Sequence, residues 1–230
     1  SSGAWQRLKE AVEALPEGST ITVNGEITAT NEGSAGVDAN WGEIFIDKDL
    51  TIQGTNKDSD ILDANSAGLA AKAHRIFTVQ SSKKLTLKKL KLKNGQPRVG
   101  ISGGAILVQT GCTADLFDCI IEGCKTGTNG NGGAMSISGT ANLTRCTVKR
   151  CEAEKNGGGL YVYGYGSKLI LDNSIIGGSE AGDGNKAVNG IGGGIFIENS
   201  GLFTMNSGEI SGNTGKEGGG VGIFGTNSSF

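Results

Sequence analysis

The sequence predicts an all-β protein: a single-stranded right-handed parallel β-helix with three short strands per coil and an N-terminal capping α-helix. Two blocks of sequence alternate along the chain, and each recurs at intervals of 25 to 35 residues. A unit of this length holds three strands but leaves no room for a crossover helix. The strands are then satisfied by stacking unit upon unit, each strand pairing with its equivalents in the neighbouring coils.

The first block consists of small residues followed by a short segment with apolar residues at alternate positions. Its copies begin at Gly103, Gly132, Gly157, Gly192 and Gly218. We name the strand that follows each glycine group strand A, with one face directed inward and the other outward. Glycine suits the preceding corner because it adopts positive φ and permits close backbone approach. The length variation falls at this corner, where the longest loop runs from residue 177 to residue 192.

The second block predicts two further strands, named B and C, that are separated by a corner. In its first copy it reads Leu87-x-x-Leu90-x-Leu92, with another apolar residue at Leu85. The later copies keep the same spacing and begin at Leu116, Leu143, Leu171 and Met205. Agreement of these registers predicts that the inward side chains stack into continuous ladders about 4.8 Å apart.

An amphipathic helix is predicted over residues 4–15, before the repeats begin. Its apolar positions recur with helical spacing at Trp5, Leu8, Val12 and Leu15. Pro16 ends this pattern, because proline cannot continue a helix interior. We expect the helix to lie across the first coil, where it protects the strand edges from pairing with other chains.

The whole chain, residues 1–230, is interpreted as one elongated domain. Residues 20–75 predict irregular opening coils, and residues 76–230 predict regular coils. Because the repeat is still running at Phe230, we expect this sequence to be a piece of a longer protein.

Charge and hydropathy argue against two classes of partner. The net charge is −2, so the chain has no general attraction for nucleic acid. No apolar stretch reaches the ~18 residues of a membrane span, so we expect no membrane-spanning segment. One basic run alternates with leucines and is interpreted as the solvated face of strands; it comprises Lys83, Lys84, Lys88, Lys89, Lys91 and Lys93.

Four of the five cysteines align in the repeat as two pairs. Cys119 matches Cys146 at an inward position, where we expect free thiols that act as small core residues. Cys124 matches Cys151 at a corner. The sequence leaves open whether these two cysteines form a disulfide or stay as free thiols. Cys112 is expected to be unpaired. The single histidine and the lack of C-x-x-C spacing predict no metal site, and no cofactor is expected.

Catalysis by paired carboxylates would require acidic residues at equivalent outward positions of adjacent coils. Asp115 aligns with threonine, asparagine and isoleucine, and Asp118 aligns with Lys89, Arg145, Asn173 and Ser207. Neither column gathers carboxylates, so we predict no catalytic residue and a non-enzymatic protein.

Aromatic residues predict the candidate binding site. All three tyrosines, Tyr161, Tyr163 and Tyr165, lie within five residues on or beside one strand A, and Phe196 occupies the outward column one coil further on. Aromatic rings on an exposed sheet stack on sugars or anchor proteins, so carbohydrate or a host or matrix protein is the expected partner. The alternative is that these rings are shielded by a neighbouring loop or pair across strands.

The repeats resemble a known family. Gly103-Gly104-Ala105-Ile106 is similar to the GGAI repeats of polymorphic outer-membrane proteins and related autotransporter-passenger β-helices. That family pairs GGAI with an FxxN motif. The corresponding positions are Ile121-x-x-Cys124, Val148-x-x-Cys151, Ile176-x-x-Ser179 and Ile210-x-x-Asn213.

The resemblance implies an exported bacterial protein, extracellular or displayed at the outer-membrane surface, that acts in adhesion or ligand binding. The family pattern supplies no catalytic residue. The alternative function is a polysaccharide-active lyase or hydrolase whose site lies largely outside this sequence, because many β-helix proteins have that activity.

Overall fold

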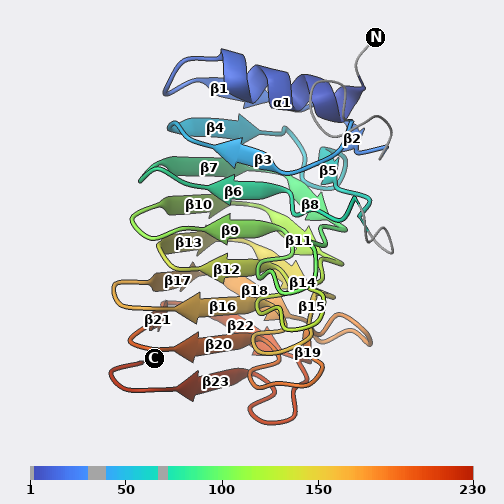
Figure 1. Cartoon of the computed structure of the whole chain (residues 1–230). Coiled ribbons are helices and arrows are strands. Elements are labelled where there is room, and N and C mark those ends of the chain that lie inside the picture. The colour runs from blue at the N-terminus through green and yellow to red at the C-terminus, as the bar shows by residue number, and fades with distance from the viewer. Residues whose placement is uncertain (1–2, 31–39, 67–71, 230) are drawn as a thin grey trace.

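The computed structural model describes residues 3–30, 40–66 and 72–229. It confirms the predicted parallel β-helix, in which three seven-stranded parallel sheets run side by side along the solenoid (Figure 1). Each coil contributes one strand to each sheet. The connections from strand C of one coil to strand A of the next lie on one side of the molecule (Figure 1). The C-terminal coil lies at the end of the solenoid opposite the helix.

The A strands are β3 (Ile44–Ile46), β6 (Phe77–Val79), β9 (Ile106–Val108), β12 (Met135–Ile137), β16 (Leu160–Tyr163), β20 (Ile195–Glu198) and β23 (Val221–Phe224). The B strands are β1 (Thr20–Thr22), β4 (Leu50–Gln53), β7 (Lys84–Lys88), β10 (Thr113–Phe117), β13 (Thr140–Thr144), β17 (Lys168–Asp172) and β21 (Leu202–Met205). The C strands are β2 (Glu26–Thr28), β5 (Ile61–Asp63), β8 (Lys91–Lys93), β11 (Ile120–Glu122), β14 (Thr147–Lys149), β18 (Ser174–Gly177) and β22 (Gly208–Ser211). A short extra pair, β15 (Glu152–Ala153) with β19 (Lys186–Ala187), joins two of the C-to-A connections.

The predicted capping helix is α1 (Ala4–Ala14), which lies across the N-terminal coil (Figure 1). It buries Trp5 and Val12, and the Trp5 indole Nε1–H donates to the Gly42 carbonyl oxygen at 2.8 Å. These contacts cover the strand edges that the first coil would otherwise present to solvent. Within the residues that the structure describes, no helix is long and apolar enough to cross a bilayer.

The in-register pairing stacks equivalent inward side chains from coil to coil. Leu87 pairs with Leu116, Leu116 with Leu143, and Leu143 with Leu171, and all four are almost fully buried. One continuous hydrophobic core therefore runs inside the solenoid. Each added coil extends this core, so burial between neighbouring coils is the main source of stability.

The opening coils differ from the expectation of irregular structure over residues 20–75. Their described strands enter the same three sheets in the same register, with Thr20 opposite Thr51 and Ile44 opposite Phe77. The same hydrogen-bonding constraint acts on them as on later coils. The parts of this range at 31–39 and 67–71 lie outside the described residues.

The corner between strands B and C uses a left-handed residue that is not glycine. Lys89, Asp118, Arg145 and Asn173 have φ of 51°, 53°, 54° and 47°. The Asp118 N–H donates to the Thr144 carbonyl oxygen of the next coil at 3.0 Å, and Lys89 and Arg145 make equivalent bonds. The inter-coil bond accompanies a conformation that is costly for side chains other than asparagine and aspartate.

The glycine corner before strand A is held by close backbone approach. A Cβ atom on Gly133 would lie 2.1 Å from the carbonyl oxygen of Gly158, and one on Gly158 would lie 2.2 Å from that of Gly193. No side chain fits in this stack, which explains the recurrent glycines of the first sequence block.

Buried polar side chains bond successive coils at the B-to-C corner. The Ser174 hydroxyl donates to the Leu143 carbonyl oxygen at 3.0 Å and accepts the Cys146 N–H at 3.0 Å. The Cys146 thiol repeats the pattern, donating to the Leu116 carbonyl oxygen at 3.4 Å. The hydroxyl and the thiol thus satisfy backbone groups that would otherwise be buried without partners.

A second polar ladder follows strand C. The Asn185 Nδ2 donates to the Val148 carbonyl oxygen at 2.8 Å, and its Oδ1 accepts the Cys151 N–H at 2.9 Å. Asn213 repeats both bonds one coil later, to Ile176 at 2.8 Å and to the Asn185 N–H at 2.8 Å.

This geometry corrects the alignment of Ser179 with Cys151. Ser179 is exposed, and Asn185 occupies the corner position instead. The reason is the long loop after β18, which leaves the strand and returns to the corner only at Asn185. A fixed spacing from Ile176 therefore selects the wrong residue.

The five cysteines are all free and buried. The expectation of free thiols at Cys119 and Cys146 is confirmed, and Cys112 is unpaired as expected. Cys124 and Cys151 form no disulfide; the Cys124 thiol donates to the Glu122 carbonyl oxygen at 3.5 Å and the Cys151 thiol to that of Lys149 at 3.3 Å. Burial raises the pKa of Cys151 well above its ordinary value, which keeps that thiol protonated.

A charge at an inward position of the stack should unfold the protein. We expect Val148→Asp to lower the free energy of unfolding by more than about 3 kcal/mol, because its carboxylate would be buried without a partner. Thr147→Asp is the matched control, since Thr147 lies on the same strand and is half-buried on the outer side. Urea denaturation of both variants measures the difference, and equal stability would contradict the inward assignment of Val148.

Asn185 and Ser179 provide a second test. We expect Asn185→Ala to destabilise the protein by about 2–4 kcal/mol, because it leaves the Cys151 N–H and the Val148 carbonyl without partners. Ser179→Ala should change stability by less than about 0.5 kcal/mol, as exposed substitutions do. Thermal unfolding of the two variants decides between the sequence spacing and the observed corner.

Candidate functional site

The predicted aromatic site divides into a buried part and an exposed part. Tyr161 and Phe196 lie on the outer face of the A sheet but are only 8% and 2% exposed, so they do not form part of an open binding face. A Cβ on Gly132 would lie 3.1 Å from Tyr161 Cβ, and one on Gly192 would lie 3.1 Å from Phe196 Cα. The glycine corners pack against the outer face of strand A, which is the physical reason for this burial.

The Tyr161 ring stacks on Phe196 of the next coil and on Tyr163 of its own strand. The Tyr161 ring lies 6.0 Å from that of Phe196 at an interplanar angle of 9°, and 5.8 Å from that of Tyr163 at 22°. The Tyr161 hydroxyl donates to Glu198 Oε2 at 2.7 Å. Burial, together with Glu198, raises the pKa of Tyr161 far above its usual value. The alternative of shielding and cross-strand pairing therefore describes Tyr161 and Phe196 correctly.

Tyr163 and Tyr165 remain accessible, at 43% and 92% exposed. Tyr163 ends strand A, and Tyr165 lies in the turn from strand A to strand B. Tyr165 lines a surface cavity of about 410 Å³ together with Lys168, Ser200, Leu202 and Asn227. This cavity combines an aromatic ring and an aliphatic side chain with a cation, a hydroxyl and an amide.

Two further exposed apolar residues belong to the same edge. Phe224 is 62% exposed and is separated from Tyr163 by Glu198 alone in the sheet register, and Leu202 is 38% exposed. Neither residue is among those that the sequence predicts for the site. The signal for Phe224 was its register with Tyr163, two coils away. We name Tyr163, Tyr165, Leu202 and Phe224 the aromatic edge.

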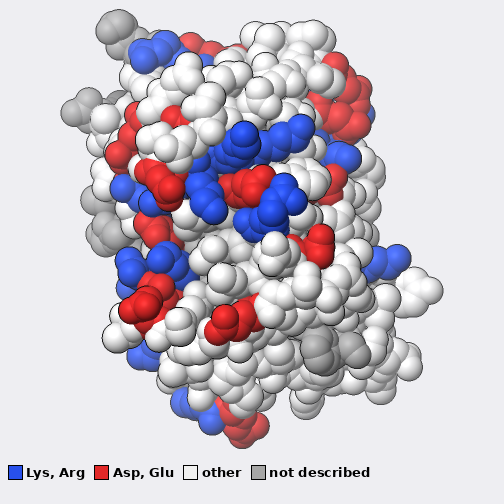
Figure 2. All heavy atoms as spheres, turned by 180° about the vertical axis from the view of Figure 1, so that it is seen from behind, with Lys and Arg blue, Asp and Glu red and all other residues white. Residues whose placement is uncertain are grey.

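Two carboxylates on the outer face of strand B and the following corner, Asp115 and Asp118, are paired with cations. Asp115 Oδ2 lies 2.8 Å from Lys84 Nζ, and its Oδ1 accepts from Asn142 Nδ2 at 2.7 Å. The Arg145 guanidinium donates to Asp118 at 2.8 Å and 2.9 Å and holds the pKa of that carboxyl below its usual range. Figure 2 shows basic and acidic side chains interspersed on this side of the molecule. The basic run is thus a solvated strand face, as the alternation predicted.

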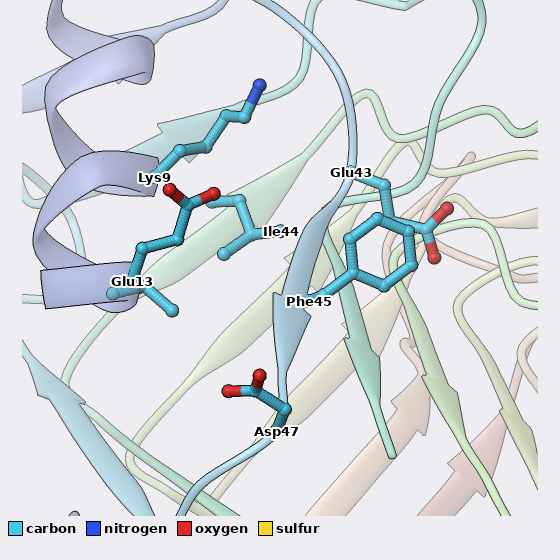
Figure 3. Close-up of a pocket in the computed structure, with 7 residues that line it drawn as sticks. Lys9, Glu13, Glu43, Ile44, Phe45 and Asp47 are labelled. Carbon is cyan, nitrogen blue, oxygen red and sulfur yellow. The ribbon is translucent and has the colours of Figure 1, made fainter. Parts of the chain in front are cut away.

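A groove between α1 and β3 is the other acidic feature (Figure 3). It has a volume of about 310 Å³ and is lined by Lys9, Glu13, Glu43 and Asp47, with Phe45 53% exposed beside them. Lys9 and Glu13 come from α1, while Glu43 and Asp47 flank β3. Across the described ranges, no three histidine, cysteine, aspartate or glutamate residues are grouped so as to hold a metal ion.

The only histidine of the chain lies near this groove. His74 is 4% exposed, and its ring centroid is 5.4 Å from that of Trp5 and 6.5 Å from that of Trp41. Its Nδ1 lies 2.8 Å from the Arg75 carbonyl oxygen, which can only accept, so Nδ1 carries the proton. Burial lowers the pKa of His74, and the positive charge of Lys9 acts in the same direction.

This pKa shift predicts how stability depends on pH. The unfolded chain takes up a proton at histidine near the ordinary value of 6.5, while folded His74 stays neutral to lower pH. Its contribution is therefore complete above pH 6.5 and is lost as the pH falls below that value. We expect the melting temperature to drop between about pH 7.5 and 5.5. His74→Phe, which keeps a ring between the tryptophans, should flatten this slope, and an unchanged slope would contradict the assignment.

Comparison with known proteins identifies the fold family and nothing narrower. No curated protein matches this chain, and no solved structure matches it. Residues 74–230 match the family described as the right handed beta helix region. That segment starts at His74 and includes strands β6 to β23. The chain therefore belongs to the family of proteins with a right-handed β-helix region.

Proposed function

We propose that this chain is a non-enzymatic binding module of a secreted or surface-displayed bacterial protein, and that it acts in adhesion through the aromatic edge. The observation that carries the proposal is the exposure of Tyr163, Tyr165 and Phe224 on one edge of a rigid solenoid, beside a cavity of about 410 Å³. Carbohydrate or a matrix protein is the proposed ligand.

The chemistry of the edge supports such a ligand. Exposed tyrosine rings offer a flat apolar face, which stacks on the C–H face of a sugar or fills a pocket of a protein. Lys168, Ser200 and Asn227 beside Tyr165 supply hydrogen-bonding groups for hydroxyls. Tyr163 is held in place by stacking on Tyr161, so little conformational entropy is lost when its ring is contacted.

Two observations support a surface protein over an enzyme. The outward carboxylates Asp115 and Asp118 are engaged with Lys84 and Arg145, which leaves them poorly suited to act as an acid and base pair. The glycine-led repeats resemble the GGAI pattern of surface-displayed β-helices, and Asn213 stands at the asparagine position of their FxxN motif. The polysaccharide-active alternative has no comparable support among the described residues.

A glycan and matrix-protein array tests the proposal. We expect the wild-type chain to bind one class of ligand, and Tyr165→Ala and Tyr163→Ala each to weaken that binding by about tenfold, as loss of an aromatic anchor does. Phe45→Ala is the matched control, because Phe45 is also an exposed aromatic residue on an A strand but lies in the N-terminal coil. This control should bind like the wild type.

Other outcomes would overturn the proposal. Binding that is indifferent to both tyrosine substitutions would remove the aromatic edge from consideration. Release of unsaturated products from an anionic polysaccharide would establish the enzymatic alternative. A rise of several degrees in melting temperature with Ca²⁺ would likewise favour that alternative.

A further inference from the structure

A second cavity lies at the opposite end of the solenoid from the aromatic edge. It has a volume of about 260 Å³, and its walls include Trp41, Glu43, His74, Arg75 and Arg98. These residues come from the segment before β3, the segment before β6 and the connection after β8. Glu43 also lines the groove of Figure 3, so the two hollows adjoin at this residue.

Arg75 is the unusual residue of this cavity. It is 4% exposed, yet within the described part of the chain neither its Nε nor its Nη1 has a hydrogen-bond acceptor. Glu43 Oε1 lies 3.2 Å from Nε, which makes an ion pair whose geometry does not satisfy a hydrogen bond. Glu43 also accepts a hydrogen bond from the Thr78 hydroxyl. A buried guanidinium with unused donors is costly unless a further acceptor is supplied.

The charges around the cavity favour an anionic acceptor. Arg98 shares its wall with Arg75, and Lys72 Nζ lies 5.8 Å from the centre of the Trp41 ring. Among the described residues that line this cavity, Glu43 alone is acidic. Arginine pairs bind planar carboxylates well, because each guanidinium presents a fork of N–H donors.

His74 adds an acceptor next to these donors. Its Nδ1–H donates to the Arg75 carbonyl oxygen, so the Nε2 of the neutral ring carries a lone pair. This Nε2 is buried, and no described residue donates to it. At neutral pH this nitrogen can accept a hydrogen bond from a hydroxyl group of a ligand.

We propose that this cavity is a binding site for a carboxylate-bearing sugar. Arg75 and Arg98 bind the carboxylate, His74 Nε2 accepts from a hydroxyl, and the Trp41 ring contacts the apolar face of the sugar ring. The site is independent of the aromatic edge, because none of its residues belongs to the last three coils. A purely structural role for Arg75 would use the same Glu43 contact but would bind no ligand.

The test is a titration of the complete chain with D-glucuronate. Binding is measured by calorimetry and, separately, by the change in tryptophan fluorescence. Glucose and acetate are titrated in parallel, because they carry the sugar ring and the carboxylate separately. We expect saturable binding of glucuronate, and binding of glucose and acetate at least about tenfold weaker, because each makes only part of the contacts. Fluorescence should respond because Trp41 is one of only two tryptophans in the chain.

Variants assign the binding to this cavity. Arg75→Gln should weaken glucuronate binding by at least about tenfold, and Arg98→Gln should weaken it by about threefold. Arg98 is exposed, so its substitution tests the site even if Arg75→Gln fails to fold. Arg145→Gln is the matched control, because Arg145 is a surface arginine that pairs with Asp118 in a distant coil. It should bind glucuronate like the wild type.

Four results would overturn the proposal. Absence of saturable glucuronate binding would leave Arg75 as a structural residue. Equal affinity for glucose would show that the carboxylate is not recognised, and equal affinity for acetate would show that the sugar is not. Equal losses in Arg98→Gln and Arg145→Gln would place the binding outside this cavity. None of these results bears on Tyr163 or Tyr165, so failure here is distinguishable from failure of the proposed function.

Discussion

The in-register parallel ladder between coils is the interaction on which the rest of this structure depends. It requires every strand to lie directly beside its equivalent, so that Leu87, Leu116, Leu143 and Leu171 share one inward column. The same requirement leaves each corner with backbone groups that must find partners between coils. Ser174, Cys146, Asn185 and Asn213 supply those partners. The fold is therefore a set of aligned columns, and each residue type is selected by the column in which it stands.

The columns of the fold can be predicted from the sequence, because residues of one column recur at regular intervals along the chain. Spacing alone predicts the inward leucines, the glycine corners and the shared column of Cys119 and Cys146. The spacing fails where a loop changes length, which is why it selects Ser179 in place of Asn185. It also does not reveal the left-handed conformation of Lys89 and its equivalents, since their side chains have no common chemistry.

The candidate site was harder to predict for a related reason. Alternation distinguishes inward from outward residues, but it does not tell whether an outward residue is covered by another part of the chain. Tyr161 and Phe196 point outward and are nevertheless buried, because the glycine corners pack against them. Tyr163 and Tyr165 lie beyond this cover. The buried Arg75 and His74 cannot be found from the repeat, since the equivalent positions of the next coil are Gly104 and Gly103.

The stacking of coils also determines how this protein responds to mechanical load. The hydrogen bonds of all three sheets are directed between coils, so a force applied evenly across the two end faces is shared by every bond of a coil pair at once. A force that pulls on a single end coil acts differently, because it loads that coil alone and separates the coils one after another. The helix α1 packs on the first described coil through the buried Trp5 and Val12, so it must detach before that coil can separate. The helix therefore opposes separation of the first coil, in addition to covering its strand edges.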